Sequence, residues 1–303
     1  MNQAVNEMLA RYKIANQRDA ENALKEIVQE IALLGLHRAN FFERAALYGG
    51  TALRILYSLP RYSEDLDFTL FKPDSDFSLA PYFSAVEREL ESYGFSVSIE
   101  KVEKRQKNDV ESAFIKANTR IHLLKVESMK GFASSTHKVS TIQVKFEVDT
   151  DPAVKFKYET RYLLAPTSFP TISLKKPDLF AGKLHALLYR KWKNRIKGRD
   201  FYDYVWYLKN DIPVRLPYLQ EKAVQSGHAQ KSELQSIESL KSALVQRFRS
   251  IDFEAAKIDV RPFIKDQSEL AIWSQDFFLQ ITEKIRIDQL NDQSNDQSEE
   301  WWK

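Results

Sequence analysis

The chain has 303 residues, a formal net charge of +3, 43% hydrophobic residues, 29% charged residues and no cysteine. This composition is typical of a globular protein, and it excludes a disulfide framework, a thiolate metal site and a thiol nucleophile. The sequence contains no apolar run long enough to span a membrane, and its N-terminal segment lacks the apolar core of a signal peptide. We therefore expect a cytoplasmic protein without a membrane partner.

Helices and strands are both expected in the first half of the chain. Helical patterns cover residues 19–35, with Asp19 as N-cap and Gly35 as C-cap, a stretch that includes Phe41, Phe42 and Ala45, and residues 51–57 and 78–93. Strand patterns cover residues 65–71, 95–104, 112–124 and 140–150. This order predicts an α+β half, in which helices flank a small mixed or antiparallel sheet.

The second half is expected to be mostly helical. Helical patterns cover residues 177–192 and 200–208, and further helices are expected between residues 217 and 288. Pro166, Pro170 and Pro177 cluster where the pattern changes. We therefore predict an α+β domain over residues 1–165 and an α-helical domain over residues 166–288. Residues 289–303 contain a polar four-residue unit twice, which indicates a disordered tail.

Two acids stand on one face of the predicted strand at residues 65–71. Asp65 and Asp67 are two residues apart, so their carboxylates point the same way and repel each other unless a cation lies between them. Mg²⁺ prefers oxygen ligands of this kind, often together with substrate phosphates. The alternative without a functional site is an exposed edge strand with solvated acids, which is common for an isolated Asp-x-Asp.

Features elsewhere in the sequence favour a metal and phosphate site. Gly49, Gly50 and Thr51 begin a predicted helix, where free backbone N–H groups can hold a phosphate. The strand at residues 140–150 carries Glu147 and Asp149 on its polar face. Either acid could complete a two-metal arrangement, and their spacing does not choose between them.

Two separated stretches resemble a known family. They are "GGTAL" with "LPRYSEDLDF", and "KKPDLFAGKLHALLYRKWKNRIKGRDFYDYVWYL" at residues 175–208. Together they resemble the AbiEii/AbiGii nucleotidyltransferases, which are toxins of type IV toxin–antitoxin systems within the DNA polymerase β-like superfamily. The resemblance covers residues 47–208, with Thr51 where the superfamily usually has serine. It implies a nucleotidyltransferase-type mixed sheet in the first domain.

The resemblance also implies roles for individual residues. Asp65 and Asp67 would hold Mg²⁺, with Glu147 as the preferred third acid, and Gly49, Gly50 and Thr51 would contact the triphosphate. Lys183 would be a cationic clamp on the triphosphate, and Asp200 and Asp203 would orient Lys183 or the acceptor.

Several of these residues could also have purely structural roles. Lys183 could be a solvent-facing helix lysine, and Asp200 could be the N-cap of the following helix. His185 has no partner at metal-ligand spacing, so we expect it to be structural. The basic run at residues 190–199 suits an RNA acceptor or a solvated helix face equally well. Arg61, beside the first motif, could contact phosphate.

The resemblance implies a Mg²⁺-dependent enzyme that transfers a nucleoside monophosphate from an NTP to an acceptor and releases pyrophosphate. The expected acceptor is RNA, in particular tRNA. The expected consequence is growth arrest, which a cognate antitoxin encoded nearby would prevent. The alternatives are a non-toxic nucleotidyltransferase that acts on a small molecule or tRNA, and an inactive relative that binds nucleotide or protein.

Overall fold

The computed structural model describes residues 2–102, 110–118, 141–191, 195–230 and 233–288. The α-helices are α1 (Gln3–Ala10), α2 (Gln17–Arg38), α3 (Gly49–Tyr57), α4 (Ala80–Ser92), α6 (Lys176–Tyr189), α7 (Gly198–Lys209), α8 (Leu216–Gln225), α9 (Ile237–Phe248), α10 (Phe253–Val260) and α11 (Gln275–Thr282). The strands are β1 (Ala45–Tyr48), β2 (Asp65–Leu70), β3 (Ser96–Lys101), β4 (Val110–Asn118), β5 (Thr141–Asp149), β6 (Tyr158–Leu163) and β7 (Phe169–Leu174). The 3₁₀ turns are η1 (Phe41–Glu43), η2 (Arg261–Phe263) and η3 (Gln267–Leu270).

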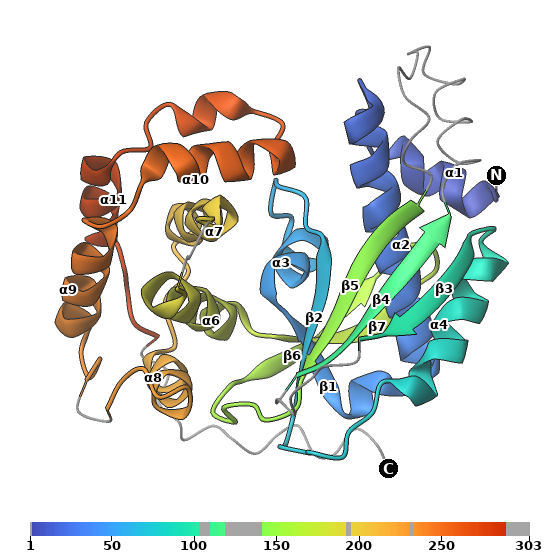
Figure 1. The fold of residues 1–303 in the computed structure, drawn as a ribbon, viewed down its shortest axis with the longest axis horizontal. Helices are drawn as coiled ribbons and strands as arrows, with labels where there is room; N and C mark the ends of the chain where they lie inside the picture. Colours follow the sequence, from blue (N-terminus) through green and yellow to red (C-terminus); the bar gives the residue numbers. More distant parts are fainter. Residues whose placement is uncertain (1, 103–109, 119–140, 192–194, 231–232, 289–303) are drawn as a thin grey trace.

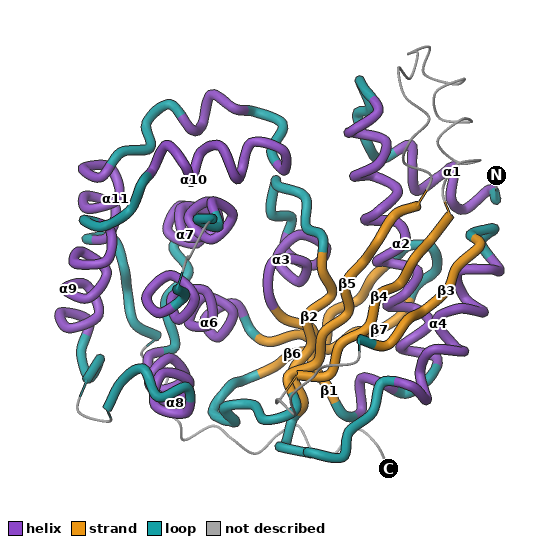
Figure 2. Tube along the Cα trace, viewed as in Figure 1, coloured by secondary structure: helices purple, strands orange, loops and turns teal. Residues whose placement is uncertain are grey.

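The strands of the described residues form one sheet in the order β3-β4-β5-β2-β1-β7-β6. Its centre is mixed, because β2 runs parallel to β5 and antiparallel to β1, while β1 runs parallel to β7. Figure 1 shows the helices from α6 onward beside this sheet, with α3 between the two parts. The same division between strands and helices can be followed in Figure 2. The predicted α+β class is therefore confirmed.

Helix α2 packs against α4 and contacts the sheet through β5 and β7. The side chain of Asn16 caps this helix by accepting from the N–H of Asp19 at 3.0 Å, so Asp19 lies in the first turn and is not the predicted N-cap. The helix also continues past Gly35 to Arg38. A Cβ on Gly35 would lie 2.8 Å from the Cα of Val86 in α4. Gly35 therefore permits the close approach of two helices and does not end α2.

The predicted helix around Phe41, Phe42 and Ala45 is wrong. The two phenylalanines lie in η1, and Ala45 begins β1. Residues 45–47 of β1 are all buried, so the strand lacks the polar and apolar alternation that marks a half-exposed strand. A four-residue buried strand between two helices therefore carries no periodic signal of its own.

Strands β6 and β7 were not predicted either, because the prolines in this region indicated a linker. Pro170 is the second residue of β7 and lies opposite Tyr162 of β6. A proline is tolerated at the start of a strand, where a missing amide hydrogen disturbs the ladder least. Because β7 belongs to the sheet, strands continue beyond the boundary placed at residue 165, and the division into domains 1–165 and 166–288 stays a prediction.

The helices from α6 onward share an aromatic core. The rings of Phe201 and Tyr204 in α7 contact Phe248 of α9 and Phe278 of α11. None of the helices in the described ranges is both long and apolar enough to cross a membrane. The predicted tail at residues 289–303, and parts of the strands predicted at residues 95–104 and 112–124, lie outside the described residues.

Candidate active site

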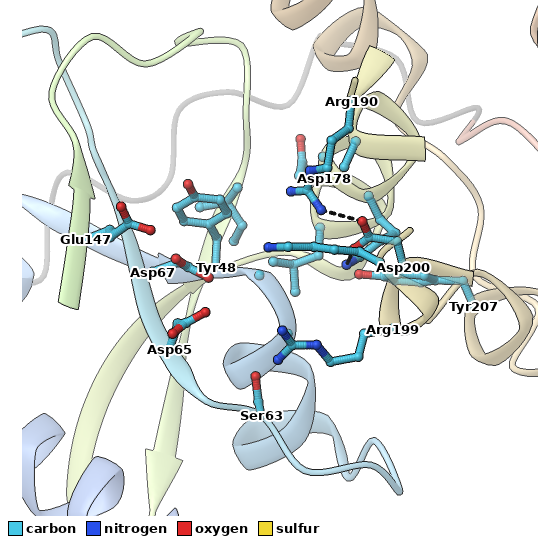
Figure 3. A pocket seen from close by; sticks show the side chains of 18 of the residues that line it. Tyr48, Ser63, Asp65, Asp67, Glu147, Asp178, Arg190, Arg199, Asp200 and Tyr207 are labelled. Carbon is cyan, nitrogen blue, oxygen red and sulfur yellow. Dashed lines mark hydrogen bonds and ion pairs between the residues drawn. The ribbon is translucent and has the colours of Figure 1, made fainter. Parts of the chain in front are cut away.

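A cavity of about 260 Å³ lies between the sheet and the helices α6, α7 and α8 (Figure 3). Its lining includes most of the residues that the sequence singled out: Gly49, Gly50, Arg61, Asp65, Asp67, Glu147, Lys183 and Asp200. Four of the residues considered for the site in the sequence analysis do not line the cavity: Thr51, Asp149, His185 and Asp203. The fold therefore brings together segments that are more than a hundred positions apart in the chain.

Three acids form the wall of the cavity on the sheet side. Asp67 of β2 pairs in register with Glu147 of β5, and Asp65 lies two residues before Asp67 on the same face. Glu147 contacts Lys145 at 2.7 Å and accepts a hydrogen bond from Ser112 at 3.2 Å. The carboxylates of Asp65 and Asp67, in contrast, form no ion pair with any other described residue.

This acidic wall has a high proton affinity. Burial raises the pKa of Asp67 to about 7, and the negative charges of Asp65 and Glu147 add to the shift, while Lys197 and Lys183 oppose it. Burial also raises the pKa of Asp65 above its ordinary value. Both carboxyls therefore lie where an added cation would relieve repulsion and lost hydration.

The acidic wall suits a divalent cation only together with further ligands. No three acidic, histidine or cysteine side chains of the described ranges form a group that could hold a metal ion by themselves. Asp65 and Asp67 nevertheless fit Mg²⁺, because this ion is often bound by one or two carboxylates, with waters and substrate phosphates supplying the other ligands.

Glycines bring the start of α3 directly against both walls. Gly49 has a φ of +77°, and a Cβ there would lie 2.8 Å from Oδ2 of Asp67. A Cβ on Gly50 would lie 2.6 Å from Nη2 of Arg61. Thr51 is fully buried, and its hydroxyl donates to the main-chain oxygen of Asp65. Thr51 thus ties α3 to β2, whereas the two glycines line the cavity with main chain.

The close approach at Gly49 gives a stability prediction. Gly49→Ala should lower the free energy of unfolding by about 1 kcal/mol for the positive φ and by at least about 1 kcal/mol more for the contact with Asp67. Gly94→Ala is the matched control, because Gly94 has a φ of +88° and a Cβ added to it would meet no atom within 4 Å. Urea unfolding of both variants measures the difference, and equal losses would contradict a tight contact at Gly49.

Basic side chains form the opposite wall and are held by buried acids. Nζ of Lys183 in α6 lies 2.7 Å from both Asp200 and Asp203 of α7. Arg61 donates to both carboxylate oxygens of Asp203, at 2.6 and 2.7 Å, and Arg190 pairs with Asp200. Burial alone would raise the pKa of Asp200, but Lys183 and Arg190 outweigh it and hold this pKa below its ordinary value.

This network changes the predicted interpretations of two residues. Arg61 is 2% exposed, and its remaining Nη1 donates to the main-chain oxygen of Tyr62 at 2.8 Å. Its guanidinium therefore joins the loop after α3 to α7. Each of its three nitrogens donates to a protein oxygen, so none needs a phosphate as acceptor. Asp200 is not an N-cap, since α7 begins at Gly198 after Lys197 and the carboxylate of Asp200 accepts from side chains.

The cavity also contains two cations that the sequence indicated only as part of a basic run. Lys197 lines the cavity and forms no ion pair with another described residue; burial and the nearby charge of Arg190 lower its pKa. Arg199 contacts Glu64 at 2.9 Å, and its guanidinium lies 4.2 Å from the ring centroid of Phe263. Residues 192–194 of the basic run lie outside the described residues.

Sequence reasoning missed several other residues of the lining, among them Tyr48, Ser63, Asp178, Tyr218 and Lys222. Burial raises the pKa of Asp178 to about 7, although Arg215 at 3.3 Å opposes the shift. Tyr48 pairs in register with Asp67, which places it beside the acidic wall. Only the position of Asp178 inside the family-like stretch at residues 175–208 could have drawn attention to it.

Two residues from the sequence analysis lie outside the cavity. Nε2 of His185 lies 2.9 Å from Oγ of Ser226, and burial lowers the pKa of this histidine to about 3; its structural role stays a prediction. Asp149 lies 3.8 Å from Lys222. Of the two candidates for the third carboxylate, Glu147 is therefore the one that faces the cavity.

Solved structures give distant similarities. A provisionally assigned nucleotidyltransferase from H. pylori is 17% identical over 85% of this chain and 89% of its own, with a TM-score of 0.45. JHP933 from Helicobacter pylori is 16% identical over 89% of this chain and 92% of its own, with a TM-score of 0.46. None of the curated proteins compared with this chain matches it. Because both TM-scores are below 0.5, we draw nothing further from these structures.

A family model gives a match over most of the chain. The model of the nucleotidyl transferase AbiEii toxin of type IV toxin–antitoxin systems matches residues 31–281. This range includes the paired acids of β2, the third acid on β5 and the charge network between α6 and α7. The match also confirms the resemblance found in the sequence. The chain therefore belongs to the AbiEii family of nucleotidyltransferase toxins.

Proposed function

We propose that this nucleotidyltransferase requires Mg²⁺, transfers a nucleoside monophosphate from an NTP to RNA, in particular tRNA, and thereby arrests growth. The observation that carries the proposal is the cavity itself, in which Asp65 and Asp67 have no ion-pair partner within the described part of the chain and face a wall of cations across a space of about 260 Å³. An NTP with its metal ion would place a cation against the acidic wall and phosphate charges against the basic wall.

The acids would provide the metal-binding part of this site. Asp65 and Asp67 would hold Mg²⁺, which when bound would neutralise phosphate charge and keep the triphosphate in position for in-line transfer. Glu147 would act as a third ligand or accept the proton of the attacking hydroxyl. Its carboxylate contacts Lys145 at 2.7 Å, and the positive charge of this lysine partly offsets the negative charge of the three acids.

The cations would divide into two groups. Lys183 and Arg61 are neutralised by Asp200 and Asp203, so they would fix the shape of the wall and contribute to binding mainly through the network. Lys197 has no such partner among the described residues, so it can pair with the triphosphate at the least cost. Main-chain groups at Gly49 and Gly50 would approach the same phosphates.

The position of Lys197 in the cavity, with no ion-pair partner in the described ranges, gives a kinetic prediction. Lys197→Met should raise the KM for the NTP by about tenfold or more, because one charge-assisted contact of about 1.5–3 kcal/mol is lost. Lys209→Met, at the exposed end of α7, is the matched control and should keep the KM of the wild type. Initial rates at varied NTP concentration measure both, and an unchanged KM for Lys197→Met would remove this residue from the triphosphate site.

Membership in a toxin–antitoxin family implies a cognate antitoxin. RNA and NTPs occur together in the cytoplasm, and we propose that the enzyme acts there.

Regulated expression tests the biological part of the proposal. Wild-type protein should stop growth, and the same level of Asp67→Asn protein should not. Transfer that continues after removal of divalent cations by EDTA would contradict the requirement for Mg²⁺. Normal growth with labelling confined to small molecules would instead indicate a non-toxic enzyme.

A further inference from the structure

A second hollow, here called the basic groove, opens beside the active-site cavity and has a volume of about 540 Å³. Its polar lining includes Arg190, Lys191 and Arg247, together with the rings of Tyr189 and His228. None of the described residues that line it is an aspartate or a glutamate. The active-site cavity, in contrast, carries acids and bases on facing walls, so the two hollows suit different parts of a substrate.

The groove and the cavity meet at Arg190, which lines both. On the cavity side, the guanidinium of Arg190 pairs with Asp200. On the groove side, the main-chain oxygen of Arg190 accepts from Arg247 at 2.7 Å, and Arg247 also donates to the main-chain oxygen of Leu187 at 3.0 Å. Arg247 thus covers the carbonyl end of α6, which would otherwise repel an anion entering the groove.

Two aromatic rings in the groove are stacked on each other and offer a surface on which a base can stack. Tyr189 and His228 are stacked, with centroids 4.9 Å apart and an interplanar angle of 16°. Nδ1 of His228 lies 2.8 Å from Oγ of Ser226, which fixes the plane of this exposed imidazole. Lys191 is exposed close by and forms no ion pair with another described residue. A cation beside a stacked ring is the combination that binds single-stranded nucleic acid, with phosphate on the cation and a base on the ring.

We propose that the basic groove binds a single-stranded segment of the RNA acceptor and leads its reactive hydroxyl past Arg190 into the active-site cavity. A base stacks on the Tyr189–His228 pair, and Lys191 binds the neighbouring phosphate. This inference rests on the proposed transfer to RNA, and it adds the location and the chemistry of acceptor binding.

The test measures RNA binding and nucleotide transfer on the full-length protein. The binding probe is a fluorescent single-stranded RNA of mixed sequence and about 12 nucleotides, read by anisotropy. His228→Ala should weaken binding about fivefold or more through lost stacking. Lys191→Glu should weaken it and flatten its dependence on salt. Lys209→Glu makes the same charge change on an exposed lysine at the end of α7 and should bind like the wild type.

Transfer kinetics separate this inference from the function on which it rests. In both groove variants the KM for RNA should rise while the KM for the NTP stays unchanged, and thermal unfolding should show that they remain folded. Equal loss of RNA binding in Lys209→Glu, or an unchanged RNA KM in both groove variants of an active enzyme, would overturn the groove. A wild-type protein that labels only small molecules, or only protein, would overturn the RNA acceptor as well.

Discussion

Asp67→Asn protein is expected to lose nucleotide transfer by about 10³-fold and yet to be more stable than the wild type. Activity falls because the amide cannot replace a carboxylate that holds the metal ion. Stability rises because Asp67 is placed against the charges of Asp65 and Glu147 with no ion pair to another described residue. In metal-free buffer above pH 7, we expect a gain of about 2 kcal/mol in the free energy of unfolding.

The pH dependence of that gain is defined by the pKa of Asp67. This pKa rises from its ordinary value of 3.8 to about 7 in the folded protein, chiefly through burial. The folded state therefore binds the proton more tightly, so the protonated carboxyl stabilises the fold most below pH 3.8, and this contribution is lost as the pH rises through 7. Asparagine does not titrate, so the stability difference between variant and wild type should grow across that range.

Denaturant unfolding at several pH values and initial-rate assays measure the two effects. Asp149→Asn is the control, because Asp149 lies on the same face of β5 as Glu147 but outside the cavity, and this variant should keep most of its transfer activity. An Asp67→Asn protein that is both active and no more stable than the wild type would show that the acidic wall is neither a metal site nor a site of charge repulsion.

Asp203→Asn protein is expected to lose about 3–5 kcal/mol of stability, the reverse of the result at Asp67. Asp203 is fully buried and neutralises Arg61, which is 2% exposed, while it also contacts Lys183. Removing its charge leaves a buried guanidinium without compensation. The double variant Arg61→Met with Asp203→Leu should be less destabilised than Asp203→Asn, because an apolar pair leaves no buried charge.

A surface pair provides the control for this second prediction. Lys241 lies 2.7 Å from Glu283, a distance close to those of the buried pairs, but Glu283 is 70% exposed. Lys241→Met should therefore change the free energy of unfolding by less than about 1 kcal/mol. If Asp203→Asn cost no more than Lys241→Met, the network that joins the loop after α3 to α6 and α7 would not hold the basic wall in place.

The sequence predicted the acidic wall better than the basic one. Alternation along a strand predicted that Asp65 and Asp67 share a face, and this rule survives folding. The same rule left Glu147 and Asp149 as equal candidates for the third acid, and only the family resemblance favoured Glu147. The pairing of Arg61 with Asp203 was not found, because the two residues are 142 positions apart and no local rule relates them. The sequence alone therefore indicates a phosphate contact for Arg61, although its partners are protein groups.

Errors in the fold had similar causes. Strand β1 is short and buried, so it carries no alternation, and β7 contains a proline near its start. Both strands are defined by their neighbours in the sheet, which local sequence does not contain. Lys197 was recognised only as one charge in a basic run, since its position in the cavity depends on how the start of α7 packs against α10, which no local pattern predicts.

Transfer of label is the measurement that tests the central claim most directly. The full-length protein is incubated with Mg²⁺, total RNA and each α-phosphate-labelled NTP in turn, and the products are separated by size. Wild-type protein should label one RNA size class with a preferred nucleotide, and Asp67→Asn and Lys183→Ala proteins should not. Wild-type levels of transfer by both variants would contradict the assignment of this cavity as the active site.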